Sequence, residues 1–138
     1  MTTSSLSQSD YVALADFRYA LRRFMAFSEG EARERGLTAQ QHQALLAICA
    51  APSSKATVGY LAERLLLKPH SATGLVDRLE TLGLIVRRPS ELDRRQALLA
   101  LTEKAQVALN ELSATHRDEI KRLKPLLQSL LDGATGDR

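Results

Sequence analysis

The sequence has no tryptophan, a single cysteine and few aromatic residues, which make up 4% of its 138 positions. One cysteine cannot form an internal disulfide, so a disulfide-stabilised secreted domain is excluded. No apolar run approaches the roughly 18 residues needed to cross a bilayer, and the first ten residues contain no apolar signal segment. With so few aromatic residues, the core must consist mainly of Leu and Ala. We therefore expect one mainly helical, cytoplasmic domain with no membrane partner.

The net charge is only +3, but the positive excess is concentrated in one part of the chain. Residues 55–104 carry nine Lys and Arg against six Asp and Glu, whereas residues 1–54 and 105–138 each carry five of either sign. Solvated surface charge explains the balanced ends better than the basic middle third. A local basic excess is typical of a surface that binds a polyanion such as nucleic acid.

Apolar residues at helical spacing, together with capping patterns, predict a largely helical chain. The expected helices cover residues 10–35, 38–51, 57–67, 69–82, 103–123 and 125–132. We expect Pro125 to kink or break the last helical segment, because proline lacks a backbone donor. Leu46 and Cys49 are expected to face inward from the second helix, and Leu66 from the third.

In residues 84–102, two short apolar runs flank a polar tip, which predicts a β-hairpin. Its arginines are Arg87, Arg88, Arg94 and Arg95. The two short helices before it predict a helix-turn-helix, whose second helix, 69–82, would enter the major groove of DNA. An isolated hairpin is marginal in water, so this one must pack against those helices. It would then act as a wing that reaches the adjacent minor groove.

Two motifs resemble the multiple-antibiotic-resistance regulator (MarR) family of winged-helix transcription factors. They are LVDRLETLGLIVRR at 75–88 and DRRQALLALT at 93–102. The second is similar to the family's wing signature, which is Asp-x-Arg, five further residues, and then Leu-Thr. The resemblance extends to LTAQQHQALLAI at 37–48 and covers about residues 10–130.

The resemblance implies a mainly α (α+β) winged helix-turn-helix that forms a single domain over residues 1–138. Helices 10–35 and 103–132 would pair two copies as a homodimer, and residues 38–102 would form the DNA-binding lobe. Members of the family bind pseudo-palindromic operators in double-stranded DNA, often repress a neighbouring gene, and are often released by a small aromatic acid. We therefore expect a ligand-responsive repressor that is not an enzyme and has no cofactor.

Residue chemistry suggests how such a lobe would contact DNA. The residues expected to do so are Lys55, Lys68, His70, Ser71, Thr73, Gly74, Arg78, Arg87, Arg88, Arg94 and Arg95. The narrow minor groove concentrates negative potential, which favours arginines at the wing tip. Arg78 would either reach a phosphate or pair with Asp77 or Glu80, and both options are open. Asp93 would hold a wing arginine by a charge-assisted hydrogen bond, or only staple the hairpin.

The chain departs from the family pattern at three positions. Lys68 stands where a capping Ser or Asp is usual, and Leu66 where the turn often has Gly. Gly74 replaces a larger polar residue in the recognition helix, which costs about 1 kcal/mol of helix stability relative to Ala.

A small-molecule site would lie where the first helix meets the DNA-binding lobe. The candidate residues are Phe17, Arg18, Arg22, Phe24, His42 and Leu46. An arginine beside aromatic rings suits an aromatic carboxylate. Core packing explains the phenylalanines equally well, and a solvated surface explains the arginines.

Two alternative functions are open: a redox-responsive regulator that uses Cys49, and a winged-helix protein-interaction module that does not bind DNA. Cys49 is expected to be a buried, inert thiol, and the local basic excess argues against the interaction module. His42 and Cys49 lie about two helical turns apart, too far to share a metal ion. The sequence also has no phosphate-binding glycine loop and no nucleophile elbow, so we expect neither a metal nor catalysis.

Overall fold

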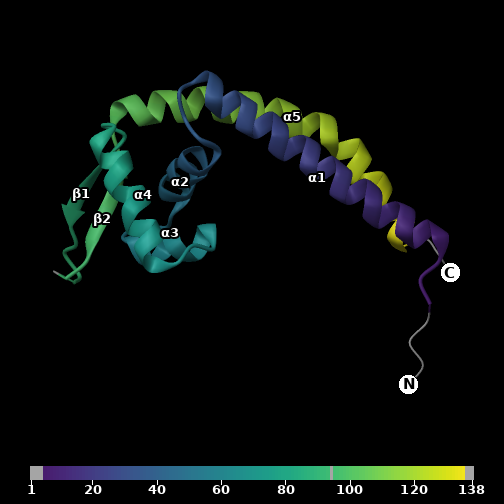
Figure 1. Cartoon of the computed structure of the whole chain (residues 1–138), viewed down its shortest axis with the longest axis horizontal. Helices are drawn as coiled ribbons and strands as arrows, with labels where there is room; N and C mark the ends of the chain where they lie inside the picture. Colours follow the sequence, from purple (N-terminus) through teal and green to yellow (C-terminus); the bar gives the residue numbers. More distant parts are fainter. Residues whose placement is uncertain (1–4, 94, 136–138) are drawn as a thin grey trace. The chain divides into compact units, whose positions relative to one another are not determined.

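The computed structural model describes residues 5–93 and 95–135, which form a mainly helical chain with one small sheet (Figure 1). In chain order, the elements are α1 (Gln8–Glu34), α2 (Ala39–Ala50), α3 (Val58–Leu65), α4 (Pro69–Thr81), β1 (Ile85–Pro89), β2 (Ala97–Leu101) and α5 (Glu103–Thr135). This order confirms the predicted helix-turn-helix, hairpin and flanking long helices. Among the described residues, no helix is both long enough and apolar enough to cross a membrane.

The chain divides into two compact units, each of which is described by itself. Unit 1 comprises Met1–Glu31 and Ala114–Arg138, and unit 2 comprises Ala32–Ser113. Unit 1 therefore contains most of α1 and the C-terminal part of α5. Unit 2 contains the helix-turn-helix, the hairpin and the first turns of α5.

Side-chain caps determine where the helices of unit 2 begin. The Thr38 hydroxyl accepts a hydrogen bond from the Gln41 backbone N–H, and the Gln41 amide oxygen accepts one from the Thr38 N–H, both at 3.0 Å. The Thr57 hydroxyl accepts from the Tyr60 N–H at 3.1 Å. Pro69 occupies the first turn of α4, where its missing N–H has no cost. These contacts confirm the predicted starts of α2, α3 and α4.

Aliphatic side chains form the core of unit 2. Its largest fully buried side chains are Leu45, Leu61, Val76, Leu79, Ile85 and Leu112. Complete burial of one such side chain stabilises the fold by roughly 1.5–3 kcal/mol. The face of α4 that was predicted to be buried, formed by Ala72, Leu75, Val76 and Leu79, lies in this core. The described core cluster contains no aromatic residue, in agreement with the composition.

The hairpin packs against the helices of unit 2, as its small size requires. Its strands are antiparallel, and Ile85 and Leu99 are buried in the core. The Leu99 N–H donates to the carbonyl of Ala56 at 2.7 Å, which ties the segment before α3 to β2. The Thr102 hydroxyl donates to the carbonyl of Gly83 at 2.7 Å and thereby ties the end of β2 to the start of β1.

Of the two alternatives predicted at Pro125, the break is wrong, because α5 is a continuous helix with Pro125 inside it, and the kink stays a prediction. An interior proline removes one backbone hydrogen bond and crowds the preceding turn, at a cost of about 3 kcal/mol. Leu123 and Leu127, on either side of the proline, line an apolar groove with α1. Both leucines are partly buried, and this burial offsets part of the cost.

Three residues that were predicted to face inward are exposed instead. Leu46 and Cys49 are exposed because α2 packs through Ala44, Leu45 and Ile48, and they lie outside that narrow face. Leu66 is 92% exposed because it adopts the left-handed conformation, with φ 55°, that ends α3. That turn directs its side chain away from the core.

Candidate nucleic-acid interface

The face of α4 opposite the core is polar and exposed. The predicted contact residues on it are His70, Ser71, Thr73, Gly74 and Arg78. The N-cap residue Lys68 makes no side-chain capping hydrogen bond, so no side-chain oxygen covers the first N–H groups of the helix. Exposed N–H groups at a helix N-terminus favour anions. This face has the chemistry that a recognition helix requires.

Thr73 and Gly74 lie in the middle of this exposed face. The Thr73 hydroxyl donates to the carbonyl of Pro69 at 3.1 Å, which leaves its oxygen free to accept. A Cβ atom added at Gly74 would meet no described atom within 4 Å. Internal packing therefore does not require this glycine, although it costs the helix about 1 kcal/mol relative to Ala. Its absent side chain leaves room for a molecule outside the chain to approach closely.

A polar hollow of about 310 Å³ joins α4 to the start of α2. Its lining residues are Thr38, Gln40, Gln41, Ser71, Gly74, Leu75 and Arg78. The sequence predicted Ser71, Gly74 and Arg78 of α4 as contacts, and none of the lining residues of α2. The one signal for α2 was its capping box, which marks a helix N-terminus without placing it beside α4. The exposed side chain of Gln40 therefore joins the candidate interface.

Ser90, a buried residue, organises the tip of the hairpin. Its hydroxyl accepts hydrogen bonds from the Leu92 and Asp93 N–H groups, both at 3.3 Å. The Asp93 carboxylate accepts from the Arg95 N–H at 3.0 Å and lies 3.5 Å from the Arg95 Nε. The Arg95 side chain is 92% exposed. Asp93 thus orders the tip while the Arg95 guanidinium stays accessible.

The two arginines of β1 face opposite sides of the hairpin, because side chains alternate along a strand. Arg87 donates through Nη2 to the Asp77 carboxylate of α4, and its Nε lies 3.6 Å from Glu80 Oε2. Arg88 is exposed and has no ion pair within the described part of the chain. The two acids considered as partners for Arg78 therefore pair with Arg87.

The remaining predicted contacts lie outside these elements. Lys55, in the loop before α3, and Lys68 are exposed. Arg94 lies outside the described residues. Apart from Arg94, all the residues predicted to contact DNA are exposed, and all of them belong to unit 2. Their roles in DNA binding stay predictions.

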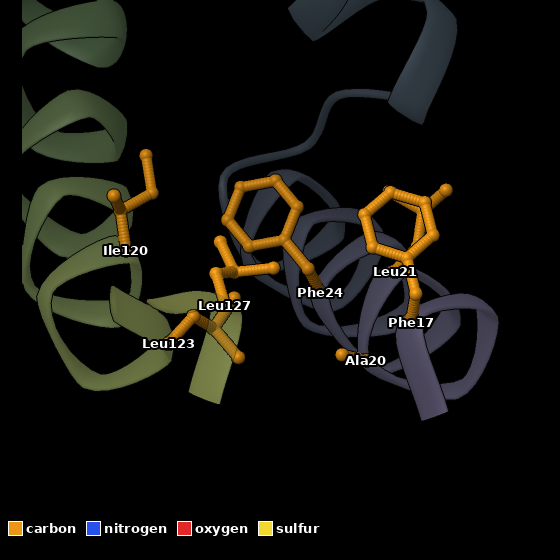
Figure 2. Close-up of a pocket in the computed structure, with 7 residues that line it drawn as sticks. All are labelled: Phe17, Ala20, Leu21, Phe24, Ile120, Leu123 and Leu127. Atoms are coloured by element: carbon orange, nitrogen blue, oxygen red, sulfur yellow. The ribbon is translucent and has the colours of Figure 1, made fainter. Parts of the chain in front are cut away.

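Unit 1 carries an apolar groove between α1 and α5, shown in Figure 2. One hollow, of about 230 Å³, is lined by Phe17, Ala20, Leu21, Phe24, Ile120, Leu123 and Leu127. A second hollow, of about 550 Å³, shares Phe17 and Leu127 with the first. Among its described lining residues, Asp10 alone is charged. We refer to both hollows as the α1–α5 groove, and its walls suit an apolar occupant.

The predicted effector residues are divided between the two units. Phe17 and Phe24 line the α1–α5 groove. The arginines predicted beside them, Arg18 and Arg22, are exposed and do not line it. The candidates from α2 belong to unit 2, where His42 is buried. The groove therefore brings together two of the predicted residues without a cation, and an effector role for all six stays a prediction.

A buried polar pair that the sequence did not predict links α1 to α5 within unit 1. His116 Nε2 lies 2.8 Å from the Ser28 hydroxyl. The imidazole also meets Phe24 and Phe27 edge to face, with ring centroids 5.8 and 5.5 Å away. No group of three or more His, Cys, Asp or Glu residues that could hold a metal occurs among the residues described. His116 therefore serves here as a packing residue between the two helices.

Comparisons with known proteins agree with this geometry. Residues 35–96 match the model of the MarR family. The HTH-type transcriptional regulator MhqR of Bacillus subtilis (strain 168) is 34% identical over 67 residues, 49% of this chain and 46% of the relative. The organic hydroperoxide resistance transcriptional regulator of the same strain is 33% identical over 86 residues, 55% of this chain and 58% of the relative. The chain thus spans about half the length of the curated relatives it matches.

Solved structures are similar over nearly the whole chain. A mutant of S. aureus MepR bound to an oligodeoxyribonucleotide is 18% identical, with a TM-score of 0.68 over 94% of this chain and 99% of that one. CouR from Rhodococcus jostii RHA1, bound to p-coumaroyl-CoA, is 23% identical, with a TM-score of 0.66 over 91% and 95%. At these identities the likeness concerns the fold, a winged helix-turn-helix. Residues 35–96 are thus similar to the MarR family, and the fold of the chain is similar to that of MepR and CouR.

Proposed function

We propose that this protein is a DNA-binding transcriptional regulator that represses a gene by occupying a pseudo-palindromic operator as a homodimer. The observation that carries this proposal is the exposed polar face of α4 beside an arginine-bearing wing, in the segment that matches the MarR family. MepR, which has a similar fold, was solved with an oligodeoxyribonucleotide bound. A repressor of this kind acts in the cytoplasm, where its operator lies.

In the proposed complex, the N-terminal half of α4 enters the major groove. Ser71 and Thr73 offer hydroxyls to base edges and phosphates, and Gly74 lets the backbone approach closely. The Arg95 guanidinium enters the minor groove, where narrow walls concentrate negative potential. Lys55 neutralises a phosphate of the same duplex.

The α1–α5 groove supports the proposed homodimer. Its walls are apolar, and α1 also exposes Leu14 and Met25 at helical spacing. A contiguous exposed apolar surface marks an interaction site. We propose that the same helices of a second copy, residues 10–35 and 103–132, cover it. A two-fold dimer would then present two α4 helices to half-sites about ten base pairs apart.

We also propose that a small aromatic acid releases the protein from DNA. CouR, whose fold is similar, was solved with p-coumaroyl-CoA bound. Phe17 and Phe24, which line the α1–α5 groove, would contact the ring, and the carboxylate would pair with a cation from outside the groove, Arg18 or Arg22. The ligand can act only if it binds more tightly to a dimer conformation that no longer matches the operator.

A DNA-binding assay tests the proposal directly. Fluorescence anisotropy would use a labelled duplex from the region upstream of the chain's own gene, over a series of salt concentrations. We expect the affinity to fall steeply with salt, and Arg95→Ala to weaken binding and lower the salt slope by about one unit. Arg117→Ala, an exposed charge of α5 in unit 1, is the matched control and should change neither value. No binding to the duplex would leave the protein-interaction module as the function.

A redox-responsive regulator is the second candidate, and the exposure of Cys49 favours it. One curated relative is named as an organic hydroperoxide resistance regulator. The test is whether an organic hydroperoxide releases DNA from the wild-type protein but not from Cys49→Ser. Equal release from both proteins, or release from neither, would exclude a Cys49 switch.

A further inference from the structure

We infer that Arg87 is a positioning residue, which clamps the wing to the recognition helix α4, and that it does not contact a phosphate. The inference rests on the proposed DNA-binding function and changes the role expected for one residue of that site. It follows from where the guanidinium points, from the side of the strand on which Arg87 lies, and from the charges around it.

The guanidinium of Arg87 is held between two carboxylates of α4. Nη2 donates to Asp77, and Nε lies 3.6 Å from Glu80. Asp77 and Glu80 are three residues apart in a helix and therefore share one face, where a planar guanidinium can reach both. The Arg87 side chain is only 33% exposed. The Nη2 donor is engaged by Asp77 and the Nε faces Glu80, so two acids of α4, rather than a phosphate, neutralise the charge of this guanidinium.

The hairpin register places Arg87 on the side of β1 that faces the core. Ile85, two residues earlier, is buried, and Leu99, the cross-strand partner of Arg87, is buried as well. The aliphatic stem of Arg87 therefore lies along the packed side of the hairpin while its charged head reaches α4. Arg88 faces the other side. One side chain thus connects the middle of β1 to the second half of α4.

The charges around Arg87 allow a test, because the clamp and simple charge repulsion predict opposite changes in DNA affinity for the same substitution. Asp77 and Glu80 belong to the helix that is proposed to enter the major groove, where phosphates would repel them. If charge alone mattered, Asp77→Asn would tighten DNA binding because it removes a repulsive carboxylate. If Arg87 acts as a clamp, the same substitution loosens the wing and weakens binding.

The first experiment compares two neighbouring arginines that carry the same charge. Arg87→Gln and Arg88→Gln are titrated against the upstream duplex over the salt series. We expect Arg87→Gln to lower the affinity about fivefold with an unchanged salt slope, and Arg88→Gln to lower the slope by about one unit. The clamp is overturned if Arg87→Gln lowers the slope as Arg88→Gln does, if it leaves the affinity unchanged, or if Asp77→Asn tightens binding.

The second experiment needs no DNA, so it separates this inference from the proposed function. Backbone amide hydrogen exchange is measured over residues 85–89 and 97–101 of the folded protein. We expect several-fold faster exchange in Arg87→Gln and Asp77→Asn, and wild-type exchange in Arg88→Gln. Wild-type protection in the first two variants would overturn the clamp even if DNA binding were established. Faster exchange in them would support it even if the upstream duplex were not bound.

Discussion

The two units of the chain differ in how far they bury their apolar side chains. In unit 2, Leu61 and Leu79 are completely buried. In unit 1, Leu14 and Phe17 of α1 remain 53% and 47% exposed. Unit 2 closes a core with its own residues, whereas the apolar side chains of unit 1 exceed what α1 and α5 cover. The difference agrees with the proposal that unit 2 binds DNA and that α1 and α5 pair two copies of the chain.

The largest predicted change is a loss of folding stability when a core side chain of unit 2 is truncated. Leu79→Ala removes a completely buried side chain, and such substitutions cost 2–5 kcal/mol, so we expect a loss of about 3 kcal/mol. Leu21→Ala, in the α1–α5 groove, makes the same chemical change at a half-exposed position. It should cost less than about 1 kcal/mol in dilute protein. Urea unfolding followed by circular dichroism measures both values. Equal losses would contradict the view that unit 2 buries its apolar side chains and unit 1 leaves its own partly uncovered.

A smaller change in free energy is predicted for the pairing of two copies of the chain. Phe17→Asp places a carboxylate in the apolar groove, where burial without a partner is costly. We expect the dimer dissociation constant to rise at least about 100-fold, which corresponds to about 2.7 kcal/mol. Sedimentation velocity over a dilution series measures it.

Ala15→Asp is the matched control for that substitution. It adds the same charge two residues earlier, on the opposite side of α1, at an exposed position that does not line the groove. It should leave the dissociation constant nearly unchanged. If both variants dissociate alike, or if the wild-type protein is monomeric, the α1–α5 groove is not the dimer interface.

Local rules predicted much of unit 2 from the sequence. Thr38, Thr57 and Pro69 mark helix starts through contacts within a few residues of themselves, so no knowledge of the fold is needed. The alternation of α4 between a core face and a polar face follows from helical period alone. The exposed candidate interface was therefore predictable as a set of residues.

Several features that the sequence did not predict depend instead on contacts between elements. Arg87 reaches Asp77 ten positions earlier in the chain, and only the packing of β1 against α4 brings them together. Cys49 was placed inside because α2 is apolar on several sides, and only packing selects which side is buried. Pro125 lies inside a continuous helix whose neighbouring residues Leu123 and Leu127 line the α1–α5 groove, and the local rule for proline takes no account of that packing.

The smallest effect concerns Leu66, whose exposure has another origin than that of the α1 side chains. Leu66 is exposed because the turn after α3 requires a positive φ, not because an interface awaits a partner. The left-handed conformation costs a non-glycine residue about 1–2 kcal/mol. Glycine also adds freedom to the unfolded chain, which removes about 0.4–1 kcal/mol of the gain. We therefore expect Leu66→Gly to raise the free energy of unfolding by about 0.5–1 kcal/mol and to leave the dimer dissociation constant unchanged.

Leu66→Ala separates the two possible causes of such a gain. Alanine keeps the Cβ that strains the turn but removes the exposed side chain, so this variant should not be stabilised. Both variants can be compared by urea unfolding under the conditions used for Leu79→Ala. Equal stabilisation by glycine and alanine would mean that the exposed leucine side chain, rather than the backbone, carries the cost. A rise in the dissociation constant of either variant would mean that Leu66 belongs with the exposed side chains of α1, and the contrast between the two units would then fail at this position.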